Sequence, residues 1–143
     1  MSPEMQAAVR AFERECPSGC SVLPQANPLY ALITIDGWPR AVHYEFRDRA
    51  DGRELYVEFH IEDPEYVGIK DTLMKTVTEI GEINGFRLSY FESRPWPHRK
   101  KWPSASLAVP KDPDGAVAAA AMRSLIAITR ERLGSAIAMH STL

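Results

Sequence analysis

Histidine and glutamate alternate with apolar residues along two neighbouring stretches, 41–47 and 54–62, and these are the side chains best able to do chemistry. Asp51-Gly52 between the stretches is a favoured two-residue hairpin turn, which would place Ala50 opposite Arg53. Counting back from that pair puts valine, tyrosine and phenylalanine on one face of the hairpin and the polar residues on the other. The polar face then pairs His43 with His60 and Glu45 with Glu58, with Glu62 diagonal to His43.

Side chains directly opposed on paired strands have Cβ atoms about 5 Å apart. Two carboxylates at that distance repel each other unless a proton, an arginine or a cation lies between them. Two imidazoles and two carboxylates also form a ligand set for a divalent transition metal. The pattern therefore predicts a candidate metal site of His43, Glu45, Glu58 and His60, which with Glu62 could instead serve a metal-dependent enzyme or a catalytic acid/base pair.

The interpretation that the sequence favours is simpler: the polar residues form the solvent-exposed face of a sheet. Arg40 and Arg47 would then neutralise the glutamates, and no cofactor would be bound. A shift of one residue in the pairing would move the whole polar set to the other face.

A second group of functional candidates lies in the segment 93–103, with the sequence SRPWPHRKKWP. Tryptophan and arginine are enriched where binding energy concentrates at interfaces, and aromatic residues among cations can also stack bases and neutralise phosphates. Prolines at 95, 97 and 103 favour an extended segment that is not a central strand. The predicted partner-binding residues are Arg94, Trp96, His98, Arg99, Lys100, Lys101 and Trp102. The alternative is that the two tryptophans fold back into the core.

Charge decides which partner this segment would bind. The 143-residue chain has a formal net charge of −2, with 17 basic and 19 acidic residues. Between residues 43 and 83, eleven acidic residues face five basic ones, while the segment 85–102 has five basic residues and one acidic residue. The acidic stretch 43–83 would repel a polyanion unless it lies on the opposite side of the protein from the basic segment. Charge segregated in this way suits docking on a protein with complementary patches. We therefore expect a protein partner before a nucleic acid.

Other chemical signatures are missing from the sequence. There is no glycine-rich phosphate loop, no G-x-S-x-G and no H-E-x-x-H, so no enzyme class is indicated. The three-residue gap between Cys16 and Cys20 is not that of a redox motif or a zinc knuckle, and reduced thiols are expected. Charged residues throughout the first twenty positions exclude a signal peptide, and no stretch is apolar enough to cross a membrane. We expect a cytoplasmic protein.

The periodicity of apolar residues predicts the elements that position these candidates. Helical spacing is found over 2–15, over 66–84, where Asn84-Gly85 is a natural stop, and from Asp112 onward. The expected strands are 29–35, 41–47, 54–62, 86–92 and 104–109. Strands joined by short turns are antiparallel, so we expect a single α+β domain over 1–143. Its architecture would be a two-layer sandwich, with a roughly five-stranded, mainly antiparallel sheet and helices on one face.

From about residue 40 to 133 the layout resembles a domain of unknown function found C-terminal to restriction-like nuclease modules. The stretches that carry the resemblance are ELYVEFHIE at 54–62, IGEINGF at 80–86, LSYF at 88–91 and SASLAV at 104–109. The resemblance implies a setting near bacterial defence systems and brings no catalytic residues. The nuclease pattern, a strand ending in (D/E)-x-K, is absent from ELYVEFHIED.

Taken together, the sequence predicts a small non-enzymatic binding protein that docks on a macromolecule, most plausibly a protein. It would modulate or inhibit that partner, as immunity and anti-defence proteins do. The alternatives are a nucleic-acid-binding accessory domain that uses the segment 93–103, and a metal-dependent enzyme on the His/Glu face of the hairpin.

Overall fold

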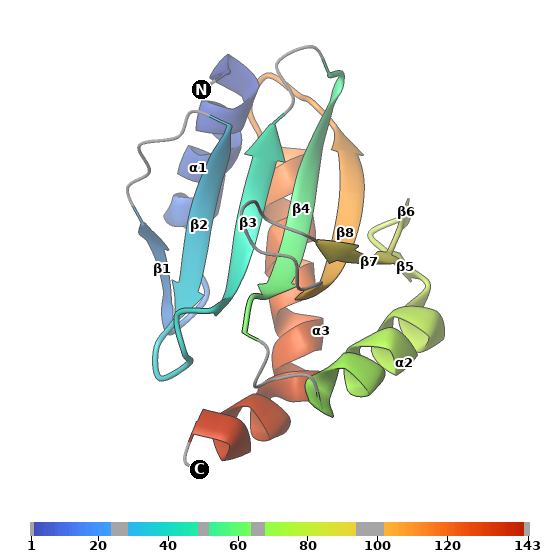
Figure 1. Cartoon of the computed structure of the whole chain (residues 1–143). Helices are drawn as coiled ribbons and strands as arrows, with labels where there is room; N and C mark the ends of the chain where they lie inside the picture. Colours follow the sequence, from blue (N-terminus) through green and yellow to red (C-terminus); the bar gives the residue numbers. More distant parts are fainter. Residues whose placement is uncertain (1, 24–28, 49–51, 64–67, 94–101, 142–143) are drawn as a thin grey trace.

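The computed structural model describes residues 2–23, 29–48, 52–63, 68–93 and 102–141, and Figure 1 shows their arrangement. The helices are α1 (Pro3–Arg14), α2 (Lys70–Ile80) and α3 (Ala116–Ser141). The strands are β1 (Cys20–Leu23), β2 (Tyr30–Ile35), β3 (Val42–Asp48), β4 (Glu54–Ile61), β5 (Glu82–Ile83), β6 (Phe86–Arg87), β7 (Ser89–Ser93) and β8 (Trp102–Pro110).

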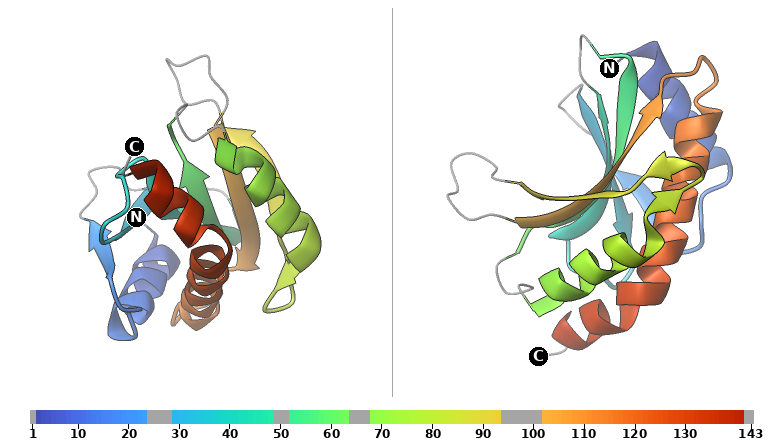
Figure 2. Two further views of the ribbon diagram at one scale, coloured as in Figure 1. Left: turned by 90° about the horizontal axis from the view of Figure 1, so that it is seen from below. Right: turned by 90° about the vertical axis from the view of Figure 1, so that its right-hand side faces the viewer.

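Six of the strands form one antiparallel sheet in the order β1-β2-β3-β4-β8-β7, and β5 pairs with β6 in a separate small hairpin. Helices α1 and α3 cover one face of the large sheet, while α2 packs beside β7 and β8 (Figure 2). The predicted α+β class, with an antiparallel sheet and helices packed on it, is confirmed.

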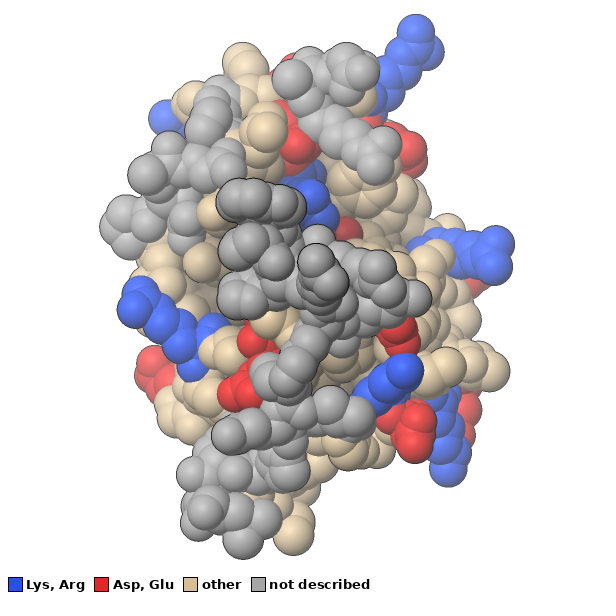
Figure 3. All heavy atoms as spheres, viewed as in Figure 1, with Lys and Arg blue, Asp and Glu red and all other residues tan. Residues whose placement is uncertain are grey.

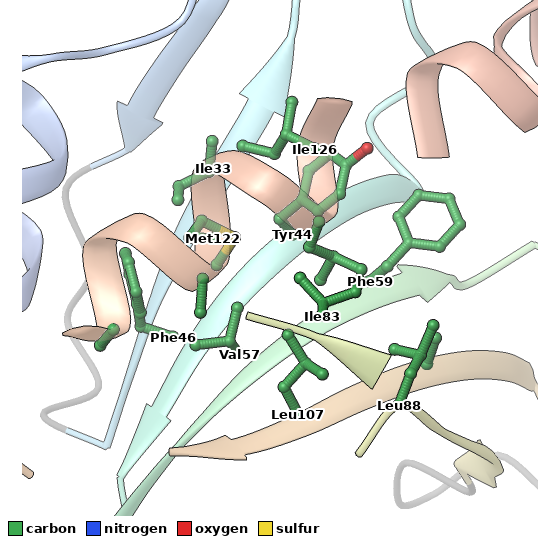
Figure 4. Close-up of a cluster of buried hydrophobic side chains, with 14 of the residues drawn as sticks. Ile33, Tyr44, Phe46, Val57, Phe59, Ile83, Leu88, Leu107, Met122 and Ile126 are labelled. Carbon is green, nitrogen blue, oxygen red and sulfur yellow. The ribbon is translucent and has the colours of Figure 1, made fainter. Parts of the chain in front are cut away.

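Alternation along the strands builds the apolar core between the sheet and the helices. On β3 and β4, Tyr44, Phe46, Val57 and Phe59 are fully buried and point toward α3, as Figure 4 shows. The hydroxyl groups of Tyr44 and Thr129 lie 2.5 Å apart, so the one polar side-chain atom of this tyrosine is satisfied inside the core. Val42, Leu55 and Ile61 share this apolar side, and the alternate positions, from His43 to Arg47 and from Tyr56 to His60, face the opposite side of the sheet.

Helix α1 begins where the sequence predicts it. The Ser2 hydroxyl accepts a hydrogen bond from the Met5 backbone N–H, and Pro3 occupies the first helical position. Met5 and Phe12 are buried along one stripe of the helix. The backbone of α1 passes so close to Gly115, at the start of α3, that a Cβ there would lie 2.2 Å from the Ala8 nitrogen.

Several local predictions are wrong. The first strand is expected at 29–35, but 20–23 also forms a strand, the edge strand β1, which pairs with β2. The helix expected over 66–84 ends at Ile80, because Gly81 adopts a φ of +71°. Asn84 and Gly85, both with positive φ, form the β5–β6 turn instead of the helix stop.

The strand expected over 86–92 is divided between β6, which pairs with β5, and β7, which pairs with β8. The sequence assigns Pro103 to a segment outside the central strands, but it lies near the start of β8. Only β7 pairs with β8 at that position, since pairing with β4 begins at Ser104. Among the helices that the structure describes, none is long and apolar enough to span a membrane.

Candidate metal centre

The register of β3 and β4 is the one predicted from the sequence. His43 lies opposite His60 and Glu45 opposite Glu58. The two imidazole rings stack with centroids 5.6 Å apart and planes inclined by 21°. The strand pairing therefore brings both histidines and both glutamates to the sheet face that α1 and α3 do not cover.

The interpretation of this face as solvent-exposed is wrong. His43, Glu45, Glu58 and His60 are only 3–8% exposed. The ring of Phe91, from the edge strand β7, meets His60 edge-on at 6.0 Å. Alternation in a sequence specifies the face to which a side chain points, but not what lies over that face, and so the burial could not be predicted.

The two nitrogens of His43 have different surroundings. Nδ1 lies 3.1 Å from the backbone carbonyl of Arg40. A carbonyl oxygen only accepts hydrogen bonds, so Nδ1 carries a proton. Nε2 faces two carboxylates, with Glu45 Oε1 at 3.1 Å and Glu62 Oε1 at 3.8 Å.

His60 lies between three carboxylates. Nδ1 is 3.1 Å from Glu62 Oε1, and Nε2 is 3.0 Å from Glu58 Oε1 and 3.5 Å from Glu45 Oε2. One ligand atom from each of four residues, His43, Glu45, His60 and Glu62, lies within 4.8 Å of all the others. We refer to these four residues as the His/Glu cluster.

Glu58, which the sequence placed in the metal set, lies beside the His/Glu cluster and is fully engaged. Its Oε1 accepts from Arg47 at 3.3 Å and from His60, and its Oε2 accepts from the Ser106 hydroxyl at 2.9 Å. Its carboxylate therefore hydrogen-bonds to His60 Nε2 and holds the orientation of that imidazole ring. Glu62, predicted only as the diagonal neighbour of His43, takes its place among the atoms that can share one ion.

Burial and charge act against each other on the acid/base groups. Burial disfavours the charged form of His60, but hydrogen bonds to Glu58 and Glu62 and the charge of Glu45 outweigh it and raise the pKa of His60 to about 9. Burial would raise the pKa of Glu58, yet the hydrogen bond and charge of His60 hold that pKa below its usual range. His60 and His43 lower the pKa of Glu62 in the same way, against the effect of burial.

A further polar atom on this face has no protein partner within the described part of the chain. Ser104 lies opposite His60 on β4 and opposite Phe91 on β7, so its side chain shares their face. The residue is fully buried, and its hydroxyl makes no hydrogen bond to any residue placed in the structure. Buried hydroxyl groups are normally satisfied, so an unsatisfied one beside a charged cluster points to a ligand or a water.

Most of the predicted partner-binding surface lies outside the described residues. Arg94, Trp96, His98, Arg99, Lys100 and Lys101 fall in that part of the chain. Trp102 is described: it is half-buried at the start of β8, where it pairs with Ser93 of β7. The structure thus leaves the role of this segment as a prediction.

On the molecular face shown in Figure 3, the coloured basic and acidic side chains are interspersed. The ion pairs of α2 illustrate this, since Glu79 binds Arg132 of α3 at 2.6 Å and Lys70 binds Glu92 of β7 at 2.6 Å. Glu79, an acidic residue of the 43–83 stretch, is thus paired with a basic residue from another element, as Asp48 is with Lys111. Segregation of charge along the chain does not carry over directly to the folded surface.

The two cysteines are both free, with Cys16 exposed and Cys20 half-buried. Burial raises the pKa of both thiols, and Glu13 adds to the effect at Cys16. Neither belongs to the His/Glu cluster.

Comparison of the chain with protein families, curated proteins and solved structures gives no match. The function must therefore be inferred from the geometry of the chain itself.

Proposed function

We propose that this protein binds one divalent transition metal ion, with zinc as the best fit, through His43, Glu45, His60 and Glu62. The single observation that carries the proposal is the spacing of four donor atoms from β3, β4 and Glu62, the residue that follows β4. Two imidazoles with two carboxylates suit zinc and neighbouring metals better than magnesium or calcium, which prefer oxygen ligands alone.

Donor distances support a tetrahedral site. Nitrogen and oxygen ligands lie about 2.0–2.1 Å from zinc, so two donors on a tetrahedron are about 3.3 Å apart. The separations from Glu62 Oε1 to His60 Nδ1 and to His43 Nε2 are 3.1 and 3.8 Å, and Glu45 Oε1 is 3.1 Å from His43 Nε2. These three separations are close to the tetrahedral value, and since the four donors lie within 4.8 Å of one another, side-chain rotation would bring the rest to an ion.

Both histidines are already oriented as metal ligands commonly are. A ligating histidine usually donates its other ring N–H to a carbonyl or a carboxylate, which fixes the ring and strengthens the donor nitrogen. His43 donates Nδ1–H to the Arg40 carbonyl and presents Nε2 to the cluster. His60 can donate Nε2–H to Glu58 and present Nδ1.

Charge supports a divalent ion at this position. A bound metal would displace the second proton that His60, with its pKa of about 9, otherwise holds at neutral pH. With both imidazoles then neutral, the carboxylates of Glu45, Glu58 and Glu62 exceed the single positive charge of Arg47 by two. Uncompensated charge in a buried site is strongly destabilising, and one divalent cation balances it. The Ser104 hydroxyl on the same face is left for a water or for a water-bearing ion.

Metal content tests the proposal. The chain, stripped with chelator and dialysed against zinc, should hold one zinc per molecule by elemental analysis, and His43→Ala/His60→Ala should hold none. Glu58→Gln should keep the stoichiometry while its affinity falls about 10–100-fold, because it orients His60 without binding the ion. The matched control is Cys16→Ser/Cys20→Ser, which removes two other potential zinc ligands and should bind as the parent does.

Circular dichroism of each variant separates loss of ligands from loss of fold. Zinc retained in full by a folded His43→Ala/His60→Ala protein, or zinc lost with the two cysteines, would overturn the proposal.

The docking function expected from the sequence stays a prediction, since its main residues lie outside the described part of the chain. Its support is the composition of residues 94–102, where two tryptophans stand among four basic residues. Trp96→Ala/Trp102→Ala should lower the recovery of a bound protein in a pull-down. Binding to short DNA or RNA with an affinity that falls steeply between 50 and 200 mM salt would favour the nucleic-acid alternative.

A further inference from the structure

A pocket of about 250 Å³ lies next to the His/Glu cluster on the same side of the sheet. Among the described residues, its lining includes Arg47, Asp48, Tyr56, Glu58, Phe91 and Ser106. Glu58 joins the two regions, because it contacts His60 on one side and Arg47 and Ser106 on the other. The volume is just below the usual range of roughly 300–1,000 Å³ for ligand pockets, so an occupant would be small.

Both carboxylates that line the pocket are already paired. Glu58 accepts three hydrogen bonds, from Arg47, His60 and Ser106. Asp48 is bound by Lys111, whose Nζ lies 2.6 Å from its Oδ1. Neither carboxylate is therefore well placed to attract a cationic ligand.

Arg47 has donor capacity to spare. Its side chain is 49% exposed, and among the described residues its guanidinium contacts only Glu58, through Nη1. A guanidinium has five N–H donors in a planar fork that matches carboxylate or phosphate oxygens. In the described lining, Arg47 is thus the charged residue with N–H donors still available. These donors favour an anionic ligand that accepts hydrogen bonds.

The described lining also contains Ser106 and two aromatic residues. Phe91 and Tyr56 come from β7 and β4, on the two sides of β8, and contribute ring surface to the pocket. We propose that this pocket binds a small anionic aromatic compound, with its phosphate or carboxylate group on Arg47 and its ring against Phe91 and Tyr56. The inference goes beyond the metal site and does not require it.

Phenyl phosphate is a suitable probe, with inorganic phosphate and phenol as its two halves. Titrations followed by NMR or calorimetry use the full chain in both chelator-treated and zinc-loaded forms. Phenyl phosphate should bind both forms, about tenfold more tightly than inorganic phosphate, because the ring buries apolar surface. Arg47→Gln should weaken its binding about 10–100-fold, as expected for a lost charge-assisted contact.

Arg87→Gln is the matched control, since Arg87 is an exposed arginine on β6 and is not part of the pocket lining. It should leave the affinity unchanged. Absence of phenyl phosphate binding in both forms would overturn the inference. Binding seen only with zinc and unaffected by Arg47→Gln would also overturn it, because the anion would then be on the metal. If the chain does not hold zinc, the titration of the chelator-treated protein still tests the pocket. The metal proposal and the pocket proposal can therefore be rejected independently of each other.

Discussion

Tyr44 and Phe59 meet across β3 and β4 in the apolar core, whereas their chain neighbours His43 and His60 meet across the same strands on the opposite face. All four side chains are buried to a similar degree. Burial of the aromatic pair is favourable by itself, at about 1.5–3 kcal/mol for a large apolar side chain. Burial of imidazoles and carboxylates is costly unless each charge is paired. The apolar pair therefore stabilises the fold directly, whereas the polar pair needs its charges compensated, by neighbouring side chains or by the proposed metal ion.

The largest expected effect is on the apolar face. Phe59→Ala removes a ring that lies 5.0 Å from Tyr44 and 6.4 Å from Trp38, and should lower the free energy of unfolding by about 3–5 kcal/mol. The zinc stoichiometry of the folded fraction should not change. Urea unfolding with metal analysis of the same samples checks both. Loss of zinc in parallel with stability would show that the two faces are not separable.

The polar face should make stability depend on pH when the protein is free of metal. The pKa of His60 rises from 6.5 to about 9 on folding, because its carboxylate partners outweigh burial. A raised pKa contributes stability that is complete below pH 6.5 and is lost as pH rises through 9, up to about 3 kcal/mol. Glu58 and Glu62, whose pKa values are lowered, contribute stability above pH 4.5 that is lost in acid.

Urea midpoints measured in chelator from pH 4 to 10 should therefore reach a plateau between about 4.5 and 6.5 and decline on both sides. His60→Gln should remove the alkaline decline and keep the acidic one in part. An alkaline limb that is the same in both proteins would contradict the assignment to His60.

A smaller effect is expected where the helices cover the apolar face. Gly115→Ala would place a Cβ 2.2 Å from the Ala8 nitrogen at a φ of +71°, and should cost about 1–3 kcal/mol as α1 and α3 move apart. Gly134→Ala is the control, because a Cβ on that α3 glycine meets nothing within 4 Å. Thermal unfolding compares the two variants. Equal stability would mean that the helix layer tolerates the shift, and zinc affinity should be unchanged in both.

The pairing of β3 and β4 could be predicted to the residue, because one slip would turn valine, tyrosine and phenylalanine away from the core. The same reasoning could not predict the contact of Phe91 with His60, since Phe91 comes from a strand about thirty residues further along the chain. Glu58 and Glu62 lie on the same face by strand alternation, so the sequence does not distinguish their roles. The contacts of Glu58 with Arg47 and Ser106 identify it as the residue that orients His60, and leave Glu62 as the proposed metal ligand.

The errors in the fold arose from glycine and proline at short elements. Asn84-Gly85 is as good a hairpin turn as a helix stop, and Gly81 ends α2 first. β1 is an edge strand of four residues whose pairing with β2 depends on tertiary contact. Local propensity alone does not determine such elements.

X-ray absorption at the zinc edge of the zinc-loaded chain tests the central claim most directly. We expect two nitrogen and two oxygen ligands at about 2.0–2.1 Å, with the multiple-scattering pattern of two imidazoles. The spectrum of Glu58→Gln should show the same first shell. A sulfur ligand at about 2.3 Å, or a shell of oxygen atoms without imidazole, would contradict the assignment of the metal to His43, Glu45, His60 and Glu62.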